Sequence, residues 1–234
     1  MRLRETRPFT SEQSTVERIF ALGWLPVHLL ALPALIVWLF YDSMDEAEMN
    51  LLVYGIGVGF MFITQFGFLR RDFDPLCDRP GQVLLEIVVC YGMMLAMNLV
   101  VNSLLLFLLP EENPNNMAVV EMADTQSGMV SALAIFLAPI VEELMFRAGV
   151  FGLLRRYNRV AAYVVSILLF ALYHVWAYAL ADPIYWLYLL QYVPISFLLC
   201  RCYERTNSIW GSIFLHMLVN AISLQVLSVL EELL

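Results

Sequence analysis

The chain has 234 residues, of which 61% are hydrophobic and 15% are charged, and its mean hydropathy is +0.75. A soluble domain carries about 25% charged residues, so this composition excludes an ordinary water-soluble globular protein. The net charge of −8 comes without any basic stripe, which argues against nucleic acid as a partner.

Seven apolar stretches are long enough to cross a bilayer, because a helical span needs about 20 mainly apolar residues. They are predicted at 19–41, 50–69, 83–110, 128–154, 160–181, 184–200 and 208–230. We therefore expect an all-α transmembrane helical bundle. We divide it into N-terminal helices with an external loop (1–127) and a C-terminal membrane core (128–234). The loop is expected at 111–127, around Asn113-Pro114-Asn115-Asn116.

The arginines predict how the spans are oriented. All 13 basic residues are arginines. Apart from Arg147, they precede span one (2–18) or follow span two (70–79), span four (155–159) and span six (201–205). Acidic residues occupy the alternate loops. The positive-inside rule then places the N-terminus in the cytoplasm. With no targeting signal recognised, we expect an integral protein of a bacterial inner membrane.

Two spans in the N-terminal part carry minor features. Gly55 and Gly59 in span two have the spacing of small residues that allow close helix packing. His28 in span one has no partner in register and is interpreted as a packing or interfacial residue. The aromatic residues from Trp176 to Tyr192 flank an external turn and fit an interfacial belt, or alternatively line a substrate entry path.

Ionisable residues within a span cost about 2.5–3.5 kcal/mol each on insertion scales and usually mark function. They occur in three spans of the C-terminal core: Glu142, Glu143 and Arg147 in span four, His174 in span five, and His216 with Asn220 in span seven. At 1.5 Å per residue, all of them lie roughly 12–22 Å from the predicted cytoplasmic edge. We therefore expect the three spans to face one another near the middle of the bilayer.

Spacing along each helix predicts individual roles. Glu143 and Arg147 are i,i+4 and can form a buried ion pair. Glu142 points about 100° away from Glu143, so it has no cation on its own helix and suits a general base. His216 and Asn220 are also i,i+4, and imidazole and amide groups are good donors to a developing oxyanion.

These residues also form three motifs. Residues 138–147, with Glu142-Glu143-x-x-x-Arg147, resemble the EExxxR motif of the CPBP family, which includes CAAX prenyl endopeptidases and bacteriocin-processing or bacteriocin-immunity proteins. Phe170-x-x-x-His174 resembles its FxxxH motif, and His216-x-x-x-Asn220 resembles its HxxxN motif. The motifs occur in the family order within residues 130–230. One departure is Ala148, where the family often has glycine.

The resemblance implies an intramembrane endopeptidase that acts on a membrane-anchored protein or peptide, with a prenylated tail as one substrate class. It implies that Glu142 and His174 activate the attacking water, that His216 and Asn220 stabilise the oxyanion, and that Glu143 and Arg147 support the site. Residues 128–234 would then be the catalytic core.

Two questions stay open at this point. Zinc is an alternative to metal-free catalysis, with Glu142, His174 and His216 as its ligands. We favour the metal-free site because the sequence has no HExxH motif and a carboxylate can activate water unaided. The alternative function is a non-catalytic binding or immunity protein that keeps the protease fold. A proton-coupled transporter is less favoured, because no inverted repeat is visible.

Overall fold

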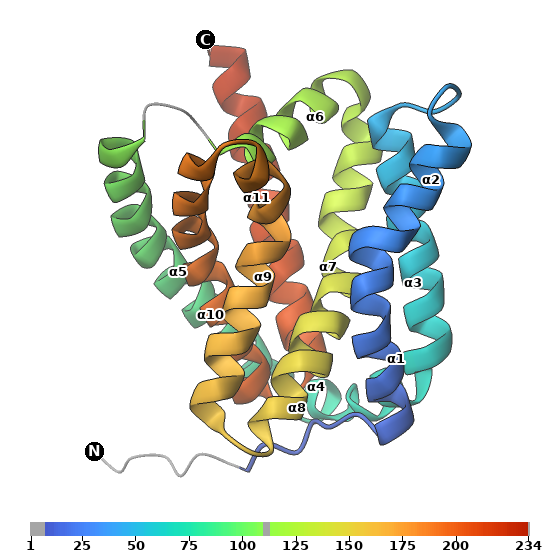
Figure 1. Ribbon diagram of the computed structural model, residues 1–234. Helices are drawn as coiled ribbons and strands as arrows, with labels where there is room; N and C mark the ends of the chain where they lie inside the picture. Colours follow the sequence, from blue (N-terminus) through green and yellow to red (C-terminus); the bar gives the residue numbers. More distant parts are fainter. Residues whose placement is uncertain (1–7, 110–112, 234) are drawn as a thin grey trace.

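The structure is a computed structural model that describes residues 8–109 and 113–233, and Figure 1 shows it as a bundle of helices. Its elements, in chain order, are α1 (Thr15–Pro26), η1 (Val27–Ala31), α2 (Leu32–Phe40), α3 (Glu46–Arg71), α4 (Asp74–Asp78), α5 (Pro80–Leu108), α6 (Pro114–Ala132), η2 (Leu133–Leu137), α7 (Ala138–Glu142), η3 (Glu143–Phe151), α8 (Gly152–Arg155), α9 (Arg159–Ala181), η4 (Pro183–Tyr188), α10 (Leu189–Thr206) and α11 (Ile209–Leu233).

Seven of the helical segments in the described part of the chain are long and apolar enough to cross a membrane. They are Thr15–Phe40, Glu46–Asp78, Pro80–Leu108, Gly128–Arg155, Arg159–Ala181, Pro183–Thr206 and Ile209–Val226. Each overlaps one predicted span. The protein is therefore an integral membrane protein, and the predicted all-α bundle of seven spans is confirmed. The N-terminal orientation stays a prediction.

The predicted loop at 111–127 is wrong over most of its length, because helix α6 begins at Pro114. The Asn113 side chain caps this helix by accepting a 3.0 Å hydrogen bond from the backbone N–H of Asn115. Proline at the first helical position is already set in a helical φ. Both signals were present in the sequence. Figure 1 shows α6 lying across one end of the bundle and turning into α7.

The fourth span is the centre of the bundle. Half of its most apolar window is buried inside the protein, against 22% for the first and third spans. It is also irregular, since η2 and η3 are π-helices on either side of the short α7. All nine residues of η3 are buried. Turns of π-helix widen the backbone spacing and occur frequently at functional sites.

Helix α3 packs against the fourth span through Gly57. A Cβ atom at this position would lie 3.1 Å from a methyl group of Val141, so only glycine fits without a shift. The interpretation of Gly55 and Gly59 as packing residues is wrong, because a Cβ atom on either would meet nothing within 4 Å. The close approach is on the face of α3 that carries Gly57.

Ion pairs tie the loops together at the end of the bundle that is predicted to be cytoplasmic. Glu204 on α10 accepts hydrogen bonds from Arg155 at 2.5 Å and Arg159 at 2.8 Å, and from the Tyr163 hydroxyl at 2.9 Å. These bonds hold the turn between α8 and α9 against α10. The α9 helix, which carries His174, is thereby fixed next to the fourth span.

Candidate active site

Three of the predicted residues converge on one point inside the bundle. The Oε2 atom of Glu142, at the end of α7, lies 3.9 Å from Nε2 of His174 on α9 and 3.9 Å from Nε2 of His216 on α11. Both spacings are too long for a direct hydrogen bond. Oε2 is buried and has no hydrogen-bond partner among the described residues. At these spacings one water molecule could bridge the carboxylate oxygen and an imidazole nitrogen from the side.

The opposite ring nitrogens of the two histidines are already engaged. Nδ1 of His174 lies 2.9 Å from the carbonyl oxygen of Phe170, and Nδ1 of His216 lies 2.9 Å from Oε1 of Glu143. A carbonyl or carboxylate oxygen can only accept, so the hydrogen-bond network assigns the proton to Nδ1 in both rings. In the neutral rings the lone pair of each Nε2 then faces Glu142.

Glu143 has partners at both of its carboxylate oxygens. Its Oε1 atom lies 3.0 Å from Nη1 of Arg147, and its Oε2 atom accepts from the Ser212 hydroxyl. The side chains of Glu143 and Arg147 are completely buried. The predicted i,i+4 pair is confirmed, and its further contact with His216 adds a role in orienting that ring.

Arg147 is held on its other sides by neutral groups. Its Nη2 atom donates to the Ser196 hydroxyl at 3.2 Å, and its guanidinium carbon lies 4.1 Å from the centre of the Phe170 ring. The buried cation is thus balanced by one carboxylate and one aromatic face. Phe170, the first residue of the FxxxH pattern, links this pair to His174 on the same helix.

Asn220 lies one turn from His216 on α11, but its amide is directed at the backbone. Nδ2 donates a 2.8 Å hydrogen bond to the carbonyl oxygen of Ala134 in η2. An amide nitrogen carries two hydrogens, so one of them stays available. The oxyanion role of Asn220 remains a prediction.

Two tyrosines complete the surroundings of Glu142, and sequence reasoning missed both. The Tyr54 hydroxyl on α3 donates to Oε1 of Glu142 at 3.0 Å and lies 2.6 Å from the Tyr173 hydroxyl on α9. His28 packs edge-on to the Tyr54 ring at 4.8 Å, so it is a packing residue as predicted. A tyrosine in an apolar span carries no charge and gives no signal in the sequence.

Tyr192 also belongs to the site. Its ring stacks on the His174 ring with centroids 4.5 Å apart, and its hydroxyl accepts from the Asn113 side chain at 3.2 Å. For this residue the interpretation as part of an interfacial belt is wrong, because it is buried on a catalytic candidate. The contact also joins the cap of α6 to the site.

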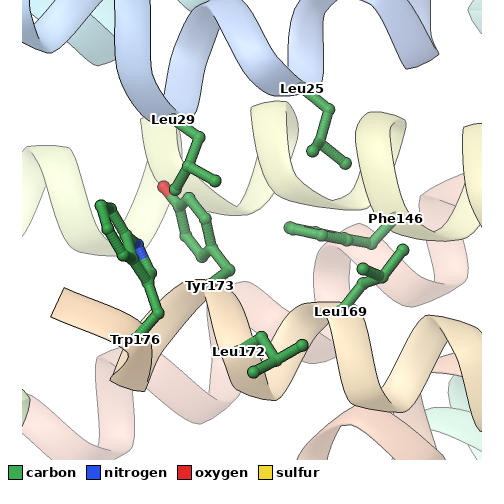
Figure 2. Close-up of a pocket in the computed structure, with 7 residues that line it drawn as sticks. All are labelled: Leu25, Leu29, Phe146, Leu169, Leu172, Tyr173 and Trp176. Atoms are coloured by element: carbon green, nitrogen blue, oxygen red, sulfur yellow. The ribbon is translucent and has the colours of Figure 1, made fainter. Parts of the chain in front are cut away.

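An apolar pocket of about 240 Å³ lies beside the site, between α1 and α9. Figure 2 shows Leu29 reaching from the first span toward Tyr173 and Leu25 reaching toward Phe146, while Tyr173 and Trp176 rise from α9. Phe146, Leu169 and Leu172 complete the lining. Tyr173 is shared, because its ring lines the pocket while its hydroxyl contacts Tyr54.

The geometry does not match a zinc site. Ligands of a tetrahedral zinc ion at about 2.1 Å lie about 3.4 Å apart, whereas Glu142 is 3.9 Å from both imidazole nitrogens. Within the described ranges, no three His, Cys, Asp or Glu residues are grouped so that they could hold a metal ion. We therefore derive no chemistry through zinc.

Comparison with known proteins points to the same C-terminal region. Residues 125–222 match the sequence model described as "Type II CAAX prenyl endopeptidase Rce1-like", and the six predicted site residues lie inside this range. This region of the chain is therefore similar to the type II CAAX prenyl endopeptidases, the family that its motifs resemble.

Two similar proteins come from bacteria. The "Putative membrane peptidase YdiL" of Bacillus subtilis (strain 168) is 31% identical over 110 residues, which are 47% of this chain and 41% of that protein. The "UPF0177 protein YxdF" of Lactococcus lactis subsp. lactis (strain IL1403) is 34% identical over 84 residues, 36% of this chain and 42% of that protein. The matches span less than half of these relatives. No solved structure is significantly similar.

Proposed function

We propose that the protein is an intramembrane endopeptidase that hydrolyses a peptide bond of a membrane-associated protein or peptide with a water activated by Glu142 and His174. The observation that carries the proposal is the convergence of the Glu142 carboxylate and two imidazole Nε2 atoms, each 3.9 Å away, in a buried site. The family match and the bacterial relative with a peptidase name support it.

In the proposed reaction, one water is held between Oε2 of Glu142 and Nε2 of His174, the atoms that face each other across 3.9 Å. Its oxygen attacks the scissile carbonyl carbon, and Glu142 takes the proton as a general base. The proton then passes to the leaving amide nitrogen as the C–N bond breaks. The products are a carboxylate and an amine.

His216 and Asn220 are the proposed donors to the tetrahedral oxyanion. Because Nδ1–H of His216 is used by Glu143 at 2.9 Å, the ring can donate from Nε2 only when it carries a second proton. The Glu143 carboxylate lies in position to balance that charge, as an acidic residue does behind a catalytic histidine. Asn220 would use the amide hydrogen that Ala134 leaves available.

The experiment is cleavage of a panel of membrane-anchored peptides, prenylated and unprenylated, by purified protein in lipid nanodiscs. Glu142→Gln and His174→Ala should each lower cleavage by at least about a thousandfold, because each removes a group that activates the water. Glu12→Gln makes the same carboxyl-to-amide change on a residue away from the site whose side chain is 37% exposed, and this variant should cleave normally.

Each reaction is repeated with a strong chelator. Activity that survives the chelator but is lost in both site variants supports the metal-free proposal. Activity that chelator removes and zinc restores would replace it with a metalloprotease. If wild-type protein cleaves no peptide, the result counts against a protease and favours a binding or immunity protein that keeps the fold.

A further inference from the structure

Helix α3 contributes a hydroxyl to the candidate site although it lies outside the region matched by the family model. The Tyr54 hydroxyl is 3.0 Å from Oε1 of Glu142 and 2.6 Å from the Tyr173 hydroxyl, and residues 125–222 are the matched region. The first half of the chain therefore touches the proposed general base directly.

The direction of these two hydrogen bonds follows from the number of hydrogens. A phenol has one O–H, and an ionised carboxylate can only accept. Tyr54 gives its hydrogen to Glu142, so Tyr173 is the donor in the short contact between the hydroxyls. The chain of donors runs from Tyr173 to Tyr54 to Glu142, and a donor that itself accepts a hydrogen bond is strengthened.

These hydrogen bonds determine which oxygen of the Glu142 carboxylate is available to the site. Oε1 of Glu142 is occupied by Tyr54, whereas Oε2 has no direct partner and lies 3.9 Å from each Nε2 atom. A carboxyl group that rotated about its terminal bond would break the Tyr54 contact. The tyrosine therefore favours the one orientation that presents Oε2 to the two histidines.

We propose that Tyr54 is a positioning residue for Glu142, and that Tyr173 acts through Tyr54 to fix its hydroxyl. The inference rests on the proposed endopeptidase function and assigns part of its site to the second span. Neither tyrosine is expected to touch the reacting atoms.

The position of Tyr54 is itself fixed by packing. Gly57, one turn further along α3, brings the helix against Val141, the residue before Glu142. His28 packs edge-on to Tyr54 and stacks with Tyr173 at 6.3 Å. Both phenol rings are thus confined by the first span, so the hydroxyl pair is held from two sides.

Loss of the Tyr54 hydroxyl removes a hydrogen bond that stabilises the charged form of the proposed base. Other polar groups face or lie next to this carboxylate from the packed elements: His174 on α9, His216 on α11, Glu143 and Arg147 on η3, and Tyr173 on α9. None of these is altered by Tyr54→Phe, so a comparison with wild type isolates one hydrogen bond.

The first experiment measures the pH dependence of kcat and KM for Tyr54→Phe on a peptide that wild-type protein cleaves. Hydrogen bonds to charged groups of this kind correspond to about a 10- to 100-fold effect. We expect kcat to fall by that factor, KM to change less than about twofold, and the pH profile of kcat to differ from that of the wild type.

Two further variants test the chain of donors. Tyr173→Phe should lower kcat less than Tyr54→Phe, by about three- to tenfold, because Tyr54 keeps its bond to Glu142. The double variant should be no slower than Tyr54→Phe alone, since Tyr173 acts only through Tyr54. Tyr163→Phe is the matched control, because it removes a hydroxyl that donates to the carboxylate of Glu204, outside the site. Its pH profile should equal that of the wild type.

A second measurement does not depend on cleavage. The carboxylate stretching band of Glu142, identified in infrared spectra by its absence from Glu142→Gln, is compared in wild type and Tyr54→Phe. We expect this band to shift in Tyr54→Phe, because the hydrogen bond to Oε1 is lost.

The outcomes separate the two proposals. Wild-type cleavage with unchanged kcat and pH profile in Tyr54→Phe would overturn the positioning role and leave the protease intact. No cleavage by wild-type protein would remove the protease proposal and with it the catalytic role of Tyr54. The infrared band would still decide whether Tyr54 bonds Glu142, and an unchanged band position overturns that bond.

Discussion

Glu142 and Glu143 are adjacent in the chain, yet their carboxylates have different surroundings in the bundle. Glu143 faces α11, and both of its oxygens have partners, in Arg147, His216 and Ser212. Glu142 lies among α3, α9 and α11, with one oxygen on Tyr54 and the other lacking a hydrogen-bond partner among the described residues. A carboxylate with both oxygens engaged stabilises the structure, whereas one with an unengaged oxygen can receive a proton.

The largest expected effect on stability comes from Glu143→Gln. It leaves the Arg147 cation buried without a counter-ion, which costs about 3–5 kcal/mol. Glu142→Gln removes a carboxylate that has no ion pair with an arginine and should unfold near the wild-type midpoint. The check is denaturant unfolding of both variants in detergent micelles, followed by tryptophan fluorescence. Equal losses in the two variants would contradict the distinction between the carboxylates.

A smaller effect is expected from Ser212→Ala. This change removes one of the donors to Glu143 but leaves Arg147 and His216 in place. Losing a hydrogen bond to a charged group should cost about 1–2 kcal/mol in the same unfolding assay. Ser103→Ala is the control, because that hydroxyl bonds only the carbonyl of Leu99 on its own exposed helix face. A Ser212→Ala variant as stable as its control would show that Glu143 does not depend on this hydroxyl.

The smallest effect is expected from Gly57→Ala, on the Glu142 side. The new methyl group would meet Val141 at 3.1 Å, and this overpacking should cost about 1 kcal/mol. Because the shift would carry Tyr54 away from Glu142, we also expect a few-fold lower kcat. Gly59→Ala adds the same methyl group where nothing lies within 4 Å. Identical melting and cleavage for the two alanine variants would mean that α3 does not position the base.

The sequence predicted the surroundings of charged residues well, because a charge inside a span needs a partner and that partner often lies on the same helix or in a recognisable motif. Glu143 and Arg147 could be paired from their i,i+4 spacing, and the structure places them 3.0 Å apart. The cost of charges in lipid also required the spans with Glu142, His174 and His216 to face one another, and these residues do converge.

Other features depended on tertiary contacts between uncharged groups, which leave no periodic or charge signal. Tyr54 reaches Glu142 across 88 positions of the chain, and Tyr192 reaches His174 by ring stacking. The choice of Gly57 over Gly55 and Gly59 depends on which face of α3 meets Val141. The start of α6 was readable from Asn113-Pro114, but the polar composition of the segment favoured a loop.

The burial of Arg147 has a consequence for how the protein is made. Its partners beyond its own helix are Phe170 in span five and Ser196 in span six. The partners of Glu143 beyond its own helix are Ser212 and His216, both in span seven. All of them leave the ribosome after span four. A lone span with three ionisable groups enters lipid at a cost of several kcal/mol. We therefore expect span four to wait beside the insertion machinery until the later spans have been synthesised.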